Sequence, residues 1–258
     1  MRTVDSSKYD RHYFEESIGT TLHKLKDGKN HILDKIVNLL PLKESDLVVD
    51  FGCGTGLLCF SLYEKYRCRV VGIDYSEDAI ALCKEYNSVL KYDNVTFLRS
   101  DISSLPRFEN VIGIYLADVI EHLYDEEIDA LFEIIGHWQQ NNEQNFHVVI
   151  HTDNLIYLKY VRWFVDLVSL ICRKTSYSEL SERNRFDKER HVNLMTLSSL
   201  SMRMKRYGYI LERIEYPEIT EERLKSQLGP LASIPLIPYL LRSSSYKLIK
   251  YLSPSFYY

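Results

Sequence analysis

The chain has 258 residues, of which 45% are hydrophobic and 26% are charged, a composition that suits one large α/β domain with a buried core. Its net charge of −4 argues against a broad nucleic-acid interface, which needs a basic face. The five cysteines show no C-x-x-C spacing, so we expect thiols in a reducing compartment, the cytoplasm, rather than a disulfide framework or a zinc site.

From residue 47 onward, short β-rich runs alternate with segments of helical pattern. Strands are expected at 47–51, 69–74, 95–99, 111–116 and 146–150. Helices are expected at 57–67, from the N-cap Ser76 to about residue 88, and from an N-cap at Asp125 through Ile135. Apolar strands separated by amphipathic helices predict a doubly wound, mostly parallel sheet that is covered on both faces.

After residue 151 this rhythm changes. A long apolar helix is expected at 155–172, but Lys159, Arg162 and Asp166 form a charged stripe along it that argues against a transmembrane span. A charged stretch without apolar periodicity follows at 174–190.

Further along, the pattern predicts a helix from its N-cap Thr196 to Tyr207 and a sixth strand at 210–216. The tail at 231–252 mixes Pro, Leu and Ile with basic residues. That composition suits contact with a membrane surface or a lipid-linked substrate, although packing against the preceding helices is the commoner explanation.

Glycine and acidic residues stand at the expected strand ends. Gly52, Gly54 and Gly56 follow the first strand, where the missing side chains let a ligand approach the backbone. The spacing G-x-G-x-G, without a following G-K-[ST], differs from the dinucleotide and P-loop fingerprints. Asp74 ends the second strand, where a carboxylate accepts from ribose hydroxyls, and Asp101 follows the third, where it accepts from an adenine amino group.

The runs D-F-G-C-G-T-G, G-I-D-Y-S, R-S-D-I and A-D-V-I-E-H-L resemble the four consecutive cofactor motifs of class I S-adenosylmethionine-dependent methyltransferases. The resemblance covers about residues 45–155 and implies S-adenosylmethionine as cofactor, with S-adenosylhomocysteine as product. It implies that Asp50 orders the glycine loop and the methionyl amine. The cofactor-binding residues that it implies are Asp50, Gly52, Cys53, Gly54, Gly56, Asp74, Tyr75, Asp101, Ile102, Ala117, Asp118, His122 and Tyr13. The alternative, that the aspartates are only caps or turn residues, is disfavoured because all of them lie in register at strand ends.

The same resemblance implies a Rossmann-like sheet of seven strands, whose last, antiparallel strand is truncated to the final S-F-Y-Y. We therefore divide the chain into three parts. Residues 1–40 are expected to form an N-terminal helical cap, 41–150 the cofactor-binding core, and 151–258 a helical substrate-side insertion with the completion of the sheet. The insertion, at about 153–195, is expected to cover the carboxyl ends of the strands.

Candidate catalytic groups follow the fourth strand. Asp118, Glu121 and His122 would share one face if this segment is helical. With His191 they resemble the E-x-x-E-H…H site of metal-dependent O-methyltransferases, in which a divalent ion lowers the pKa of acceptor hydroxyls. Asp118 departs from that pattern, because those enzymes have Glu there, so a divalent metal is not favoured. His191, His151 and His122 are then the candidate catalytic residues, with structural roles for His151 and His122 as the alternative.

A sulfonium donor is already activated, so the protein supplies proximity, orientation and, for a hydroxyl acceptor, deprotonation. The runs D-V-I-E-H, H-T-D-N-L and R-H-V-N-L-M-T resemble tailoring methyltransferases of quinone, polyketide and surface-glycan pathways. This resemblance implies O-methylation of a small molecule or glycan. The alternatives are N- or C-methylation on the same scaffold and a regulatory subunit that binds the cofactor without chemistry.

Overall fold

The structure is a computed structural model that describes residues 3–17, 31–140, 142, 145–160, 162–171, 175–215 and 255–257. It consists of two compact units, Met1–His151 and Thr152–Tyr258. Within the described ranges, no helix combines the length and the hydrophobicity that a membrane span requires. The tail at 231–252, for which membrane contact was one interpretation, lies outside the described residues. The division of the chain into cap, core and insertion stays a prediction.

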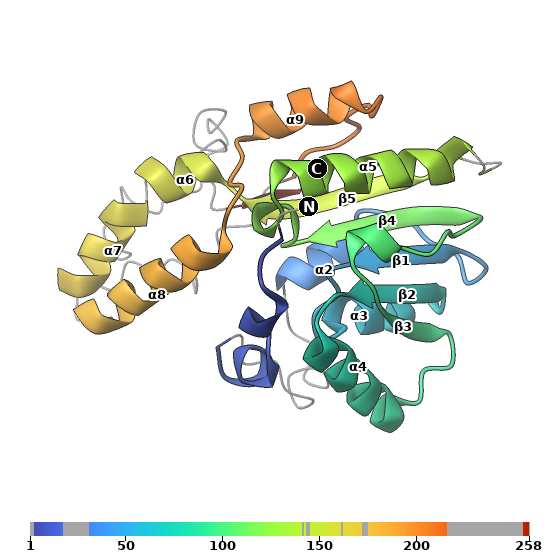
Figure 1. Cartoon of the computed structure of the whole chain (residues 1–258), viewed down its shortest axis with the longest axis horizontal. Coiled ribbons are helices and arrows are strands. Elements are labelled where there is room, and N and C mark those ends of the chain that lie inside the picture. Colours follow the sequence, from blue (N-terminus) through green and yellow to red (C-terminus); the bar gives the residue numbers. More distant parts are fainter. Residues whose placement is uncertain are drawn as a thin grey trace, which may run out of the picture. The chain divides into compact units, whose positions relative to one another are not determined.

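The first unit is built on a parallel sheet (Figure 1). Its strands are β1 (Leu47–Phe51), β2 (Arg69–Asp74), β3 (Val95–Arg99), β4 (Val111–Ala117) and β5 (His147–Asp153). They are arranged in the order β3-β2-β1-β4-β5, and each neighbouring pair is parallel. The expected strands are therefore confirmed to within three residues at their ends, and so is the α/β class of the fold.

Three helices connect these strands: α3 (Leu57–Tyr66), α4 (Glu77–Leu90) and α5 (Asp125–Gln140). Because parallel crossovers are right-handed, the strand order places α3 and α4 on one face of the sheet and α5 on the other. The central strands are accordingly buried on both faces, with Val48, Val49 and Ile114 fully inaccessible. This double burial explains why the strands read as continuous apolar runs rather than as alternating ones.

Local side chains fix the helix ends. Ser76 caps α4, because its hydroxyl accepts from the Ala79 amide, as predicted. α5 begins at Asp125 itself, so Asp125 lies in the first turn and not at the N-cap that was expected. Three acidic residues occupy that turn, where their charge complements the helix dipole. The predicted cap therefore lies one residue into the helix.

The N-terminal segment of the first unit is built from short helical turns, a 3₁₀ turn at Ser6–Lys8 and a π turn at Tyr13–Ser17. The helix α2 (His31–Val37) follows and packs on α3. Val4, Tyr9 and Phe14 are buried. This segment therefore contributes to the core of the first unit despite its short elements.

The second unit contains α6 (Leu155–Tyr160), α7 (Arg162–Ile171), α8 (Tyr177–Arg190), α9 (Leu197–Arg206) and β6 (Ser255–Tyr257). The helix expected at 155–172 is described as α6 and α7, on either side of residue 161, which lies outside the described residues. The charged stretch, for which no helix was predicted, forms α8. Ser176 and Glu179 begin it with a capping box, a signal that the sequence carried. Thr196 caps α9 as predicted.

The sixth strand expected at 210–216 is wrong for the part that is described. Residues 210–214 form no strand, and the side chain of Ile210 is 87% exposed. A strand is stabilised when one of its faces is buried, and the side chain of Ile210 is not buried. β6 stands where the short last strand was expected, but the described residues do not reach seven strands. The placement of the insertion over the strand ends stays a prediction.

Two glycines give a matched test of packing in the first unit. A Cβ at Gly72 in β2 would lie 2.8 Å from Cys59 Sγ and from the Phe97 ring, so Gly72→Ala should lower the free energy of unfolding by about 1–3 kcal/mol. At Gly136 in α5 a Cβ would meet nothing within 4 Å, so Gly136→Ala should be neutral or stabilise by up to about 1 kcal/mol. Urea unfolding measures both, and equal effects would contradict the packing described for β2.

Candidate functional site

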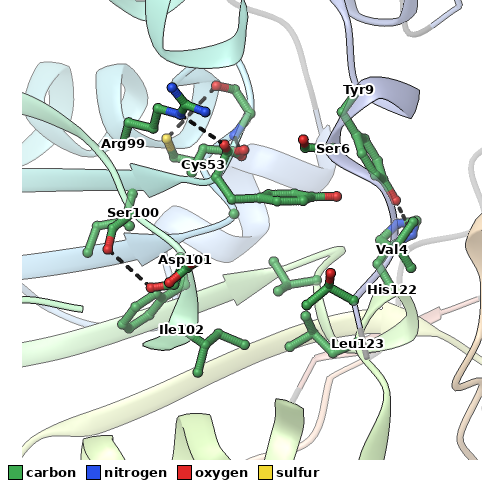
Figure 2. Close-up of a pocket in the computed structure, with 18 of the residues that line it drawn as sticks. Val4, Ser6, Tyr9, Cys53, Arg99, Ser100, Asp101, Ile102, His122 and Leu123 are labelled. Atoms are coloured by element: carbon green, nitrogen blue, oxygen red, sulfur yellow. Dashed lines mark hydrogen bonds between the residues drawn. The ribbon is translucent and has the colours of Figure 1, made fainter. Parts of the chain in front are cut away.

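A cavity of about 1050 Å³ opens at the carboxyl ends of the strands in the first unit (Figure 2). The strand ends contribute Phe51, Asp74, Arg99 and Ala117 to its wall, and the N-terminal segment contributes another part, which includes Tyr9. A ligand site at this edge is the usual arrangement for an open parallel sheet. Of the predicted cofactor residues, those that line the cavity are Gly52, Cys53, Gly54, Asp74, Tyr75, Asp101, Ile102, Ala117, Asp118, His122 and Tyr13.

The glycine loop has a backbone that other residues would adopt only with strain. Gly52, Gly54 and Gly56 all have positive φ angles, of 65°, 52° and 80°. A Cβ at Gly52 would also lie 2.7 Å from a methyl group of Val119. Glycine at these positions lets the loop turn sharply after β1. Gly52 and Gly54 therefore present their backbone to the cavity.

Asp74 holds this loop in place. Its Oδ2 accepts from the Gly54 amide at 2.9 Å, and its Oδ1 accepts from the Ser76 amide at 2.8 Å. The side chain is only 7% exposed. Burial, together with the charge of Cys53, raises the pKa of Asp74 to about 7. Asp74 is therefore a strong hydrogen-bond acceptor at the cavity wall that carries a proton more readily than an exposed aspartate.

Asp50 lies beneath the loop rather than on the cavity wall. Its side chain is 2% exposed, and the Cys59 thiol donates to its Oδ2 at 3.2 Å. Burial raises the pKa of Asp50 well above its usual range. This geometry supports a role in ordering the loop, whereas the direct contact with a methionyl amine that the resemblance implies stays a prediction.

Gly56, the last predicted cofactor residue, also packs inward, because a Cβ there would lie 2.9 Å from the Phe97 ring.

Asp101 is a cap, one of the two roles that the sequence left open, and it also lies at the cavity. It caps the 3₁₀ turn Ile102–Ser104, where its Oδ1 accepts from the Ser104 amide at 2.9 Å and from the Ser103 hydroxyl at 2.7 Å. These hydrogen bonds, the one from Ser103 first, lower the pKa of Asp101. Asp101 and Ile102 also line the cavity. The cap thus fixes an ionised carboxylate at the end of β3.

The N-terminal segment supplies a group that the predicted site lacked. The Tyr9 hydroxyl lies 3.1 Å from Nδ1 of His122 (Figure 2). The Ser76 hydroxyl donates to the Tyr9 carbonyl at 2.6 Å, and the Tyr9 ring packs edge-on against the rings of Tyr13 and Tyr75. Tyr9 and His122 are 113 positions apart in sequence. No local spacing could have predicted their contact.

Asp118 and His151 form a second pair. Asp118 has a φ of 56°, a left-handed conformation that is uncommon for a residue with a side chain. Its Oδ1 lies 2.6 Å from Nδ1 of His151, and the two side chains are 61% and 4% exposed. Asp118 lines the cavity, whereas His151 is not among the lining residues. His151 therefore lies behind Asp118 and positions its carboxylate.

The remaining candidates lie apart from the cavity wall or in the other unit. Glu121 is 2% exposed and is not among the lining residues. His191 ends α8 in the second unit, with Nδ1 3.8 Å from Asp153 Oδ2, and its catalytic role stays a prediction. In the described part of the chain, no three His, Cys, Asp or Glu side chains are grouped so that they could hold a metal ion.

Part of the chain is similar to known methyltransferases. Residues 42–135 match the model of a family described as a methyltransferase domain. A protein N5-glutamine methyltransferase of Methanocaldococcus jannaschii is 35% identical over 98 residues, 36% of this chain and 46% of that protein. Phosphoethanolamine N-methyltransferase 3 of Arabidopsis thaliana is 31% identical over 132 residues, 51% of this chain and 25% of that protein. The chain spans less than half the length of these two relatives.

Solved structures show the same fold. Phosphoethanolamine N-methyltransferase 2 of Haemonchus contortus, in complex with S-adenosyl-L-methionine, has a TM-score of 0.58 at 16% identity, over 96% of this chain and 58% of that one. Magnesium protoporphyrin IX methyltransferase of Synechocystis PCC 6803, with bound S-adenosylhomocysteine, has a TM-score of 0.52 at 18% identity, over 84% and 94% of the two chains. At these identities the likeness is one of fold.

The raised pKa of Asp74 predicts how stability depends on pH. Because burial raises this pKa from 3.8 to about 7, the folded state holds a proton that the unfolded state releases. This bound proton stabilises the folded state fully at pH values below the pKa of Asp74 in the unfolded chain. Its contribution is lost as the pH rises through about 7, the pKa of Asp74 in the folded state. We therefore expect the free energy of unfolding of Asp74→Asn to increase relative to the unsubstituted protein between about pH 4 and about pH 8. Urea unfolding over this range measures the difference.

The control is Asp93→Asn. A hydrogen bond from Tyr63 lowers the pKa of Asp93, so its contribution to stability is lost as the pH falls instead. The same rise with pH in both variants would contradict the assignment to Asp74.

Proposed function

We propose that this chain, whose residues 42–135 match the model of a methyltransferase domain, is a class I S-adenosylmethionine-dependent methyltransferase that transfers a methyl group to a hydroxyl group of a small molecule or glycan. The observation that carries the proposal is the cavity at the strand ends, where the glycine loop with Asp74 and the Tyr9–His122 pair line one space. The first of these groups suits a nucleoside-containing donor. The second suits removal of a proton from an acceptor.

The cofactor would lie across the ends of β1, β2 and β3. Asp74 accepts from the ribose hydroxyls, because its carboxylate is buried at the cavity wall and oriented by two backbone amides. Asp101 and Ile102 frame the adenine, and the methionyl part lies along the backbone of the glycine loop. Asp50 acts from beneath, by keeping that loop ordered.

Proton removal would involve Tyr9 and His122. If the Tyr9 hydroxyl donates to Nδ1 of His122, the tyrosine oxygen accepts the acceptor's proton while its own proton passes to the imidazole. Asp118, exposed to the cavity and held by His151, orients a polar group of the acceptor. The reaction then needs no metal ion. Oxygen attack on the sulfonium methyl is an in-line displacement that depends chiefly on this positioning.

N-methylation is the second candidate, because the cavity wall is acidic. Asp5, Asp74, Asp101, Asp118 and Glu127 all line the cavity, whereas its lining contains one Arg and no Lys. That cation, Arg99, is paired with Glu77 at 2.8 Å. A wall of this charge favours a protonated amine, from which the same Tyr9–His122 pair would take the proton. A regulatory subunit that binds the cofactor without turnover is the remaining alternative.

Cofactor binding is tested first at Asp74. Asp74→Ala should weaken the binding of S-adenosylhomocysteine by about 1–3 kcal/mol, the cost of losing charge-assisted hydrogen bonds. Isothermal calorimetry measures the affinity, with the exposed loop variant Glu109→Ala as the matched control. Unchanged affinity in Asp74→Ala would remove this residue from the site, and micromolar binding of NADH would overturn the class of cofactor.

Tyr9 and His122 are tested by their effect on turnover. Tyr9→Phe and His122→Asn should each lower kcat by about 10²–10⁴-fold, the usual contribution of general base catalysis, and should leave cofactor affinity almost unchanged. Tyr63→Phe is the control, because its hydroxyl bonds Asp93 away from the cavity. A panel of hydroxyl and amine acceptors separates the two candidate reactions, and turnover on neither would leave the regulatory alternative.

A chelator is expected to leave the rate unchanged. Loss of activity with chelator, restored by magnesium, would instead support the metal-dependent mechanism and would contradict the metal-free proton transfer.

A further inference from the structure

Three thiols surround the glycine loop. Cys53 is in the loop itself, Cys59 is in the first turn of α3, and Cys83 is in the middle of α4. They are 8%, 0% and 0% exposed, and all are free thiols. The neighbouring thiols of Cys59 and Cys83 lower the pKa of the Cys53 thiol. The fold thus brings together sulfur atoms from three separate elements.

The sulfur atoms of Cys53 and Cys83 face the same backbone atom. Cys83 Sγ lies 3.1 Å from the carbonyl oxygen of Gly54, and Cys53 Sγ lies 3.9 Å from it. Cys59 is turned towards the core instead, where its thiol donates to Asp50 at 3.2 Å. Cys83 is therefore the better placed partner for Cys53.

Of the three cysteines, Cys53 is also the one that lies at the cavity. It lines the cavity (Figure 2), whereas neither Cys59 nor Cys83 is among the lining residues. Burial opposes ionisation of Cys53, but hydrogen bonds from the other two thiols lower its pKa. Burial raises the pKa of Cys59 and of Cys83. The thiolate is the form that reacts with an oxidant. We therefore expect oxidation to begin at Cys53, the cysteine of the three that lines the cavity.

We propose that Cys53 and Cys83 are an oxidative modification site that closes to a disulfide. A peroxide first transfers one oxygen to the Cys53 thiolate, which gives a sulfenic acid and hydroxide. The Cys83 thiol then attacks the Cys53 sulfur, the S–O bond breaks, and the leaving oxygen departs as water. The sum is two thiols and one hydrogen peroxide converted into one disulfide and two waters. A dithiol reductant reverses the bond.

The disulfide would change the cofactor site. It joins the glycine loop to α4 and removes the hydrogen bond that Cys83 donates to the Gly54 carbonyl. The amide of Gly54 is the group that Asp74 holds, so a shift of this residue alters both the loop and the Asp74 carboxylate. This loss of cofactor binding rests on the proposed function, whereas formation of the disulfide does not.

The first experiment maps the bond. The full chain is treated with hydrogen peroxide, its remaining thiols are alkylated, and the peptides are identified by mass spectrometry. We expect a Cys53–Cys83 crosslink that disappears after reduction and is absent in Cys83→Ser, and we expect Cys59→Ser to form it as the unsubstituted chain does. A crosslink of Cys53 to Cys59 in its place, or no crosslink at Cys53, overturns the proposal.

The second experiment measures the consequence. Calorimetric affinity for S-adenosylhomocysteine should be at least about tenfold weaker in the oxidised than in the reduced protein, and reduction should restore it. In Cys83→Ser the two conditions should give equal affinity. An intact crosslink with unchanged affinity overturns the effect on the cofactor site. A reduced protein that does not bind S-adenosylhomocysteine contradicts the proposed function instead, and the mapped bond still decides the modification site.

Discussion

The hydrogen bond from the Gly54 amide to Asp74 joins the turn after β1 to the end of β2, and the cavity depends on it. The parallel register brings the two strand ends level, because Asp50 and Phe51 pair with Gly72 and Ile73. A second bond, from the Cys53 amide to the Ile73 carbonyl at 3.0 Å, repeats the link one residue earlier. The loop is thus held through the backbone amides of Cys53 and Gly54. Gly52 and Gly54 line the cavity, where a ligand can approach them.

The sheet could be predicted from the sequence because a parallel strand buried on both faces is a local apolar run. The same reasoning failed where apolar periodicity was misleading. α8 has almost no apolar face, yet its capping box at Ser176 and Glu179 starts a helix. Residues 210–214 were expected to form a strand, but they form none, and the side chain of Ile210 is exposed. The pattern of apolar residues therefore predicts a helix or strand best where burial of that element decides its structure. It predicts less well where a capping interaction or a contact with a distant part of the sequence decides it.

Some residues of the candidate site could be predicted from the sequence, and others could not. Asp74 and Asp101 could be placed from sequence, because each follows a strand end. The contact of Tyr9 with His122 could not, because it joins segments 113 residues apart. The sequence alone did not place His151 beside Asp118, a contact that follows from the register that pairs Ala117 with His151 on adjacent strands. It could not tell that Asp118 faces the cavity while His151 lies behind it, since that depends on the positive φ of Asp118.

The position of β1 in the sheet has a consequence for how the chain is made. β1 pairs with β2 on one edge and with β4 on the other, and residues 52–110 lie between β1 and β4. A chain that emerges from the ribosome from its N-terminus completes β1, β2 and β3 first. During that interval the apolar β1 has one unpaired edge, which attracts other strands. Nascent-chain chaperones would therefore find their most exposed target in this strand until residue 117 has been synthesised.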